Sequence, residues 1–348
     1  MKIIVDAMGG DNAPDQIVLG AVQAAAAYDV EILLVGRGEE ILESLKNNGM
    51  DTLPKGVEIA NADDVVDMHD DPAKVVKTRK DSSMVQGLRL LSDGSGDAMV
   101  SAGSTGALLS AATLVVKRIR GIRRAAMSPV VPTAKGGCLL IDCGANAECT
   151  PEFLLQFACM GSFYAEKALG RQNPTVALLN IGEEDTKGAA LQKEAWALLK
   201  QAGDNGDINF IGNIEARNVP LDGADVVVAD GFSGNVLLKG IEGTAIFLSG
   251  FMKDMFKKNL KTKIAALLVS DGLKDFKKLL DYREVGGTVM LGLTKPVVKA
   301  HGSSDALAIQ NAVRQAMEAV QSDVCGEIAR NIDKMRISRQ TEEKSHAE

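Results

Sequence analysis

The sequence predicts a three-layer α/β/α fold around a mostly parallel mixed sheet. Short apolar segments rich in valine and isoleucine alternate with segments of helical periodicity over most of the 348 residues. This alternation is typical of βαβ units with helices on both faces of a sheet. Residues 1–335 are expected to form a single catalytic domain, and a chain of this length also allows two intertwined subdomains.

The predicted elements can be read in order along the chain. The strand candidates are Lys2–Met8, Glu31–Val35, Val57–Asn61, Ala98–Ala102, Leu139–Cys143, Thr175–Ile181, Asn209–Ile214 and Asp225–Asp230. The helical patterns between them are Gln16–Tyr28, Pro72–Leu91, Gly106–Arg118, Pro151–Leu169 and Ala189–Ala202. Two further strands, Val285–Leu293 and Pro296–Ala300, are separated by a short turn that suits an antiparallel pair. A long helical pattern covers 304–334, and the polar residues 336–348 are predicted to form a flexible tail.

A helical insertion at residues 244–280 interrupts this alternation. Its central part, Phe251–Val269, has apolar residues at helical spacing, among them Leu260, Ile264 and Leu267, beside a stripe of lysines at Lys253, Lys257 and Lys261. Two interpretations stay open. The helix faces the core or a second subunit with a solvated lysine edge, or it lies on the surface and contacts an anionic membrane or an acidic protein. The methionines and phenylalanines favour the second interpretation slightly.

Composition and charge exclude several classes of protein. The net charge of −7 and an aromatic content of 4% are unsuited to nucleic acid binding. The five cysteines lack a C-x-x-C spacing, and no leader segment is recognisable, so we expect free thiols in a reducing cytoplasm. No apolar run approaches the length of a membrane span. We expect neither a metal nor another cofactor.

Polar side chains follow several predicted strands at the point where each strand ends. The segment 178–188 passes from an apolar run to three acids and Lys187. Asp6, Gly9 and Asn12 lie at the end of the first strand, and Ser104 and Thr105 precede a helix after the fourth. Other strand ends carry Asn146, then Ser233 with Asn235, and finally His301 with Ser304. Open α/β sheets bind ligands at such ends, and small residues there expose the backbone amides that bind anions.

Each of these loops also has a purely structural interpretation. The glycine pair after Asp6 could form an ordinary turn, and Ser104 or Thr105 could only cap a helix. His301 could be structural. Because no nucleophile–base pair is evident, the residues best suit a reaction in which the substrate itself is the nucleophile. Inorganic phosphate attacking a thioester fits, since the site must then stabilise an oxyanion and release a thiolate.

Six ordered motifs, DAMGGDNAP, SAGSTGAL, IDCGAN, NIGEEDTKG, DGFSGNVLLKGIEG and KAHGSSD, resemble those of the bacterial acyl-[acyl-carrier protein]:phosphate acyltransferase (PlsX) family of phospholipid synthesis. The resemblance spans nearly the whole chain. It implies an isocitrate/isopropylmalate dehydrogenase-like fold, a homodimer, and conversion of long-chain acyl-[acyl-carrier protein] and phosphate into acyl phosphate. It also implies a cytoplasmic enzyme at the inner face of the cell membrane, supplying a membrane glycerol-3-phosphate acyltransferase.

The resemblance also suggests a role for each site residue. Lys187 and Asn235 match positions for phosphate binding and oxyanion stabilisation, and His301 is the candidate third catalytic group, protonating the thiolate. The expected phosphate or substrate contacts are Asp6, Gly9, Asn12, Ser104, Thr105, Asn146, Ser233 and Ser304. The lysine-edged helix is expected to contact the carrier protein or anionic lipid. The alternatives are a short-chain phosphotransacetylase using coenzyme A, an NAD- and metal-dependent oxidative decarboxylase of the same fold, and a non-catalytic organiser on the lipid surface.

Overall fold

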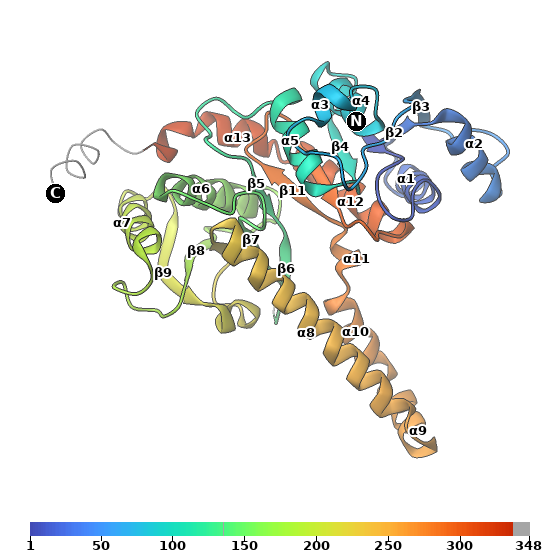
Figure 1. Ribbon diagram of the computed structural model, residues 1–348. Coiled ribbons are helices and arrows are strands. Elements are labelled where there is room, and N and C mark those ends of the chain that lie inside the picture. Colours follow the sequence, from blue (N-terminus) through green and yellow to red (C-terminus); the bar gives the residue numbers. More distant parts are fainter. Residues whose placement is uncertain (135, 337–348) are drawn as a thin grey trace.

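The computed structural model describes residues 1–134 and 136–336, and it contains two mixed sheets (Figure 1). The first sheet has seven strands in the order β3 (Val57–Asn61), β2 (Glu31–Gly36), β1 (Lys2–Asp6), β4 (Ala98–Ser101), β12 (Val297–Ala300), β11 (Gly287–Leu291) and β5 (Ala126–Ser128). The strands from β3 to β12 are parallel, whereas β11 is antiparallel to both of its neighbours. The expected antiparallel pair near residue 295 is therefore confirmed.

The second sheet has five strands in the order β6 (Val130–Thr133), β7 (Gly136–Ile141), β10 (Val226–Val228), β8 (Thr175–Asn180) and β9 (Asn209–Glu215). Only β6 is antiparallel to its neighbour. The predicted fold class is confirmed, but the strands divide between two sheets. The short strands β5 and β6 were not predicted, because three or four residues give too little periodicity to recognise.

Helices cover both faces of each sheet. On the first sheet, α1 (Asp15–Tyr28) and α12 (Ala306–Gln321) pack together on one face, and α4 (Ser83–Ser92) and α5 (Thr105–Val115) cover the other. On the second sheet, α6 (Pro151–Lys167) and α7 (Ala190–Asp204) cover one face, opposite the 3₁₀ turn η1 (Ala216–Leu221). The short helices α2 (Gly38–Asn47) and α3 (Val75–Thr78) complete the first half of the chain.

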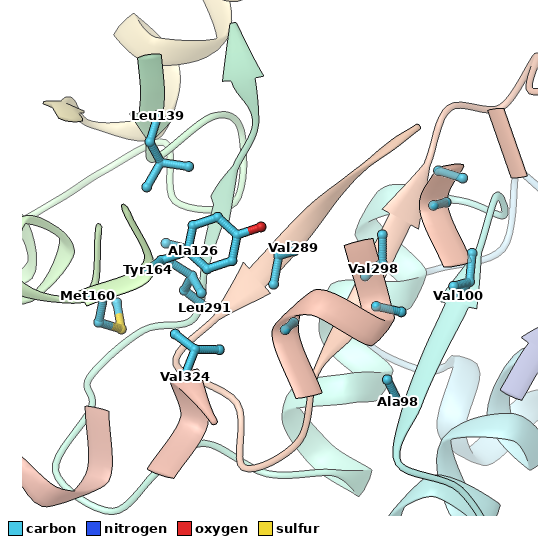
Figure 2. Close-up of a cluster of buried hydrophobic side chains, with 14 of the residues drawn as sticks. Ala98, Val100, Ala126, Leu139, Met160, Tyr164, Val289, Leu291, Val298 and Val324 are labelled. Atoms are coloured by element: carbon cyan, nitrogen blue, oxygen red, sulfur yellow. The ribbon is translucent and has the colours of Figure 1, made fainter. Parts of the chain in front are cut away.

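One apolar core joins the two sheets. Figure 2 shows it running from Val100 of β4 through Val298 and Leu291 to Leu139 of β7 and Tyr164 of α6, all with almost no exposed surface. The five cysteines are free thiols, three of them buried. Because the sheets share this core, their strand ends are held in a fixed relation.

Two predicted helices of the body differ from those observed. The pattern at Pro72–Leu91 divides into α3 and α4, because Ser82 caps a new helix by accepting a hydrogen bond from the Val85 amide. The long C-terminal helix ends at residue 321, and Asp323 adopts a left-handed conformation before α13 (Val324–Arg330) and the 3₁₀ turn η2 (Ile332–Met335). Except for Arg336, the predicted tail lies outside the described residues.

The insertion forms an arm that projects from the body (Figure 1). The predicted span, 244–280, covers the second half of α8 (Gly231–Lys257), all of α9 (Leu260–Leu268) and α10 (Ser270–Leu280), and α11 (Tyr282–Val285) returns the chain to the body. The expected single helix at Phe251–Val269 is broken at Asn259, which caps α9. No residue of α9 is buried, which rules out packing of this helix into the core of its own chain. Within the described residues, no helix is both long and apolar enough to span a membrane.

Candidate active site

The loops that follow β1, β4 and β12 meet at one edge of the first sheet. The chain leaves β1 toward β2 and β3, and it later returns to form β4 on the other side of β1. This reversal of strand order creates the crevice in which open α/β sheets bind ligands. The Asp11 amide donates to the Gly302 carbonyl at 2.8 Å, and the Asn12 side chain donates to the carbonyls of Ser303 and Ser304.

Asp6 connects the loop after β1 to the loop after β4. Its carboxylate accepts hydrogen bonds from the Ser101 hydroxyl at 2.6 Å and the Met8 amide at 3.3 Å. Burial raises the pKa of this carboxyl, and hydrogen bonds from Ser101 and its neighbours counter that rise. A Cβ on Gly9 would lie only 2.7 Å from the Asp6 carboxylate and 2.8 Å from the Gly103 nitrogen. Glycine at position 9 is thus required for the loops to approach each other.

The predicted phosphate contacts in these loops divide into exposed and buried groups. Ser104 and Thr105 begin α5 and keep some exposed surface, and the Ser104 hydroxyl makes no capping bond to the helix. Ser104 and Thr105 are therefore placed to meet a ligand. Ser304, in contrast, is fully buried, and its hydroxyl has no hydrogen-bond partner among the described residues. Like Asp6, Ser304 is placed to support a loop.

On the second sheet, β7 ends in a loop organised around the buried Asp142. The Asp142 carboxylate accepts hydrogen bonds from the Met127 amide at 2.8 Å and the Asn146 amide at 2.7 Å. The Asn146 side chain donates to Asp142 at 3.0 Å and to the Ala125 carbonyl at 2.9 Å. Both protons of that carboxamide are thus used within the protein, so Asn146 supports the site. Burial raises the pKa of the Asp142 carboxyl and of the Cys149 thiol, the latter to about 11, which agrees with a structural cysteine.

The first turn of α8 lies directly on this loop. Asp230 caps the helix by accepting hydrogen bonds from the Ser233 amide at 2.9 Å and its hydroxyl at 2.8 Å. A Cβ on Gly231 would come within 2.5 Å of the Asn146 carbonyl oxygen, and one on Gly234 within 2.0 Å of the Asp142 oxygen. Residues 231–235 were expected to form a loop, but they are the first residues of α8. Their glycines serve close packing rather than a turn.

Asn235 occupies the second turn of α8, where it is exposed beside Gly144. A Cβ at Gly144 would lie 3.6 Å from its carboxamide carbon. Within the described residues, the Asn235 side chain makes no hydrogen bond. Its N–H groups are thus available to a ligand.

Lys187 lies on a loop that asparagine side chains hold in shape. Asn180 donates to the Lys187 carbonyl at 3.1 Å, and Asn213 donates to the Glu184 carbonyl at 2.8 Å. The Lys187 ammonium is about half exposed and lies 3.8 Å from Glu184, at the outer limit of an ion pair. A pair at this distance and exposure is weak, so it leaves the ammonium able to bind an anion.

His301 follows β12 and is held by its own loop. Its Nδ1 accepts a hydrogen bond from the Ser303 amide at 3.2 Å and lies 2.8 Å from the Ser303 hydroxyl. This contact assigns the proton of the neutral ring to Nε2. Burial, together with the positive charges of Lys239 and Lys299, lowers the pKa of His301. The ring is thus a neutral Nε2–H donor near pH 7.

Two lysines of this region were missed from the sequence. Lys299 is the third residue of β12 and is buried, which lowers its pKa to about 8. Lys239 is on α8, paired with Glu242 at 2.7 Å, and its charge lowers the pKa of both Lys299 and His301. Both lysines fall within the six sequence motifs, but Lys299 lies inside an apolar strand and Lys239 on a helix, so neither is a residue of a polar loop. The sequence signal that could have identified Lys299 was a lysine inside a strand predicted to be buried.

A large apolar cavity adjoins these loops. Its volume is about 1020 Å³, and it lies between the Lys187 loop, η1 and the arm. Apolar side chains dominate its lining, including Leu179, Ile181, Val236, Ile241 and Leu248. Gly188 and Ser233 also line it, so the loop that carries Lys187 and the helix that carries Asn235 border the same space. The cavity places an apolar compartment beside groups suited to an anion.

Comparisons with known proteins identify the family of this chain. A family described as "Fatty acid synthesis protein" matches residues 1–327. The chain is 48% identical to a phosphate acyltransferase of Alkaliphilus oremlandii, with 96% of this chain and 98% of the relative aligned. It is 46% identical to a phosphate acyltransferase of Geobacillus thermodenitrificans over 96% and 99% of the two chains.

Among solved structures, the fold is similar to a phosphotransacetylase from Streptococcus pyogenes, with a TM-score of 0.61, 21% identity and coverage of 93% and 94%. It is also similar to 4-hydroxythreonine-4-phosphate dehydrogenase from Klebsiella pneumoniae, with a TM-score of 0.54, 13% identity and coverage of 92% and 99%. At these identities the structures establish the fold alone, whereas the sequence relatives establish the family. The chain therefore belongs to the fatty acid synthesis protein family and, with these relatives, is an acyltransferase of the phosphate acyltransferase type.

Proposed function

We propose that the enzyme transfers a long-chain acyl group from acyl-[acyl-carrier protein] to inorganic phosphate, forming acyl phosphate for phospholipid synthesis. The observation that carries this proposal is the apolar cavity beside the polar strand-end loops. Its volume is at the upper end of the roughly 300–1,000 Å³ of small-molecule sites. Burial of each methylene contributes about 0.8 kcal/mol, so such a cavity favours a long acyl chain and offers little to an acetyl group.

In the proposed reaction, a phosphate oxygen attacks the thioester carbonyl carbon. A carbon–oxygen bond forms, and the carbonyl oxygen becomes an oxyanion. The Asn235 carboxamide and the Lys187 ammonium are the donors for that oxyanion, and one well-placed donor contributes roughly 3–4 kcal/mol. The carbon–sulfur bond then breaks, and the thiolate leaves. The proton of the attacking hydrogen phosphate ends on the sulfur, and His301 assists the departure of the thiolate by donating a hydrogen bond from Nε2, because Nδ1 is already occupied by Ser303.

The direct test measures thiol release from palmitoyl-[acyl-carrier protein] as a function of phosphate, with acyl phosphate trapped by hydroxylamine. We expect both products to require phosphate and to form in equal amounts. Acetyl-CoA should compete weakly, if at all. Preferred turnover of acetyl-CoA would instead favour a short-chain phosphotransacetylase, and thiol release without trapped acyl phosphate would contradict the proposal.

A matched pair of variants on α8 tests the role of the cavity. The Cβ positions of Gly240 and Gly250 both face open space, but only Gly240 lines the cavity. We expect Gly240→Phe to lower turnover of the palmitoyl donor at least tenfold and that of a butyryl donor much less. Gly250→Phe should leave both rates near wild type. If Gly240→Phe lowered turnover of both donors equally, the cavity would not be the binding site of the long acyl chain.

The exposed face of α8 supports the proposal of a homodimer. Phe247 and Phe251, which do not line the cavity, are each more than half exposed, and their rings stack at 6.4 Å. Apolar side chains gathered in this way along one helix are expected to be covered in solution. Sedimentation velocity of Phe247→Asp should detect monomers if this face joins two copies, whereas an unchanged dimer would place the interface elsewhere.

We further propose that the end of the arm rests on the inner face of the cell membrane. Leu260 and Leu267 are about three-quarters exposed on α9, beside Lys253, Lys257 and Lys261. An apolar face with a lysine border suits anionic lipid, and the lysines also suit an acidic carrier protein. Delivery of acyl phosphate to a membrane glycerol-3-phosphate acyltransferase would follow from this position.

A further inference from the structure

A buried lysine lies at the end of β12 without a carboxylate partner. Only 8% of Lys299 is exposed. Its ammonium donates to the carbonyl oxygens of Ala102, at 3.4 Å, and Ala300. Within residues 1–134 and 136–336, no carboxylate oxygen lies within 4.0 Å of this nitrogen. A buried charge without a counterion is costly, so the position calls for an anion.

The charged groups around Lys299 do not meet this need. Asp6, on β1, attracts the ammonium, but its carboxylate is engaged with Ser101 and the loop amides. Asp11 also attracts it, from an exposed position in the next loop. Lys239 on α8 repels it, and His301, two residues along, is held as a neutral ring by its lowered pKa. Within the described residues, no carboxylate therefore touches the Lys299 ammonium, and its nearest partners are the two carbonyl oxygens.

One N–H donor of Lys299 makes no hydrogen bond within the described residues. An ammonium group has three N–H donors, and two of them are directed at the carbonyls of Ala102 and Ala300. Lys299 is aligned with Ser101 in the parallel ladder between β12 and β4. Its position is therefore at the strand reversal, between the loop of Ser104 and the loop of His301.

We propose that Lys299 binds the phosphate co-substrate, supplying a positive charge within the edge of the first sheet. This rests on the proposed function, and it assigns the first sheet to phosphate and the Lys187–Asn235 side to the thioester oxyanion. Phosphate is largely dianionic near neutral pH, so the buried ammonium and the dianion offset each other's cost of desolvation. Because burial holds the pKa of Lys299 near 8, phosphate binding at that pH should be accompanied by uptake of a proton.

The test compares Lys299→Met with Lys295→Met in the full-length protein. Lys295 precedes the same strand at its other end, is half-buried, and also donates to a backbone carbonyl, that of Gly96 at 3.3 Å. With inorganic phosphate as the probe in a ³¹P NMR titration at pH 7, we expect Lys299→Met to weaken binding at least tenfold and Lys295→Met less than twofold. In turnover, the KM for phosphate should rise in Lys299→Met while the KM for the acyl donor stays within twofold.

Two further measurements keep the test decisive. Lys299→Arg should regain part of the phosphate affinity. In the wild-type protein, affinity should fall as pH rises through about 8, although phosphate itself becomes more anionic. Wild-type affinity in a folded Lys299→Met protein, or wild-type binding that strengthens steadily from pH 7 to 9, would overturn the inference. Because these titrations need no acyl donor, they can succeed even if the proposed acyl transfer fails.

Discussion

Replacing Lys299 by methionine should stabilise the protein at pH 7 in the absence of phosphate. Methionine keeps most of the apolar stem and removes the buried charge. The fall in the pKa of Lys299 from 10.5 to about 8 corresponds to roughly 3 kcal/mol of unfavourable free energy for the charged form. Loss of the hydrogen bonds to the two carbonyls offsets about 1 kcal/mol. The expected net gain in the free energy of unfolding is therefore about 2 kcal/mol.

The pH dependence of this gain in the free energy of unfolding shows whether it comes from removing the charge or from a change in packing. The folded-state pKa of Lys299 lies below its unfolded value, so neutral lysine is fully tolerated above about pH 10.5. The stability that the neutral side chain retains is lost as pH falls through about 8, because the buried amine must then carry a charge. The advantage of the methionine variant should thus shrink by about 2 kcal/mol between pH 7 and pH 10.

Urea denaturation of both proteins, in phosphate-free buffers at pH 7 and pH 10, provides the measurement. Comparison with wild type at each pH removes the titration of other lysines and tyrosines. The reasoning would be refuted by a variant that is less stable at pH 7, or by a stability difference that is the same at both pH values. Adding phosphate at pH 7 should narrow the difference, because only the wild-type protein gains from binding.

Three further predictions concern the other parts of the enzyme. Lys187→Ala should lower turnover at least tenfold at saturating phosphate with the fold intact; a wild-type rate would remove this lysine from the mechanism. Leu260→Glu combined with Leu267→Glu should release the enzyme from anionic vesicles in co-sedimentation while activity on soluble acyl donor persists. Unchanged sedimentation would show that α9 is covered by protein instead. Gly234→Ala should lower the free energy of unfolding by about 2 kcal/mol or more, because its Cβ would lie 2.0 Å from the Asp142 carbonyl oxygen; a fully stable variant would show that α8 can shift.

Most strands of both sheets were predictable from the sequence, because buried parallel strands are continuous apolar runs. The start of α8 was not. The segment GFSGN has the composition of a loop, but Gly231 and Gly234 are helical and serve contact with the loop after β7. Glycine required by close packing and glycine required by a turn look the same in one sequence. The division into two sheets was also hidden, since periodicity reports the face of a strand and not its neighbour.

The candidate site residues show the same limit. Polar residues at strand ends point to one region of the molecule, since parallel strands bring their ends together. Their roles depended on contacts that no spacing contains. Asp6 and Asn146 are engaged inside their loops, whereas Asn235 is exposed with its carboxamide available. Lys299 escaped attention because an apolar strand surrounds it, and only its burial beside carbonyl oxygens marks it as unusual.

The helix α8 links the site to the arm through a single rigid element. Its first turn is fixed on the Asp142 loop, its second carries Asn235, its third carries Lys239, and its middle walls the apolar cavity. Over 27 residues it extends roughly 40 Å, to the start of the exposed α9. At the return of the arm, Arg283 pairs with Asp281 and, at 2.9 Å, with Asp305, the N-cap of α12 beside the His301 loop. Both ends of the arm are thus anchored next to candidate site residues, with Asn235 near one end and the His301 loop near the other.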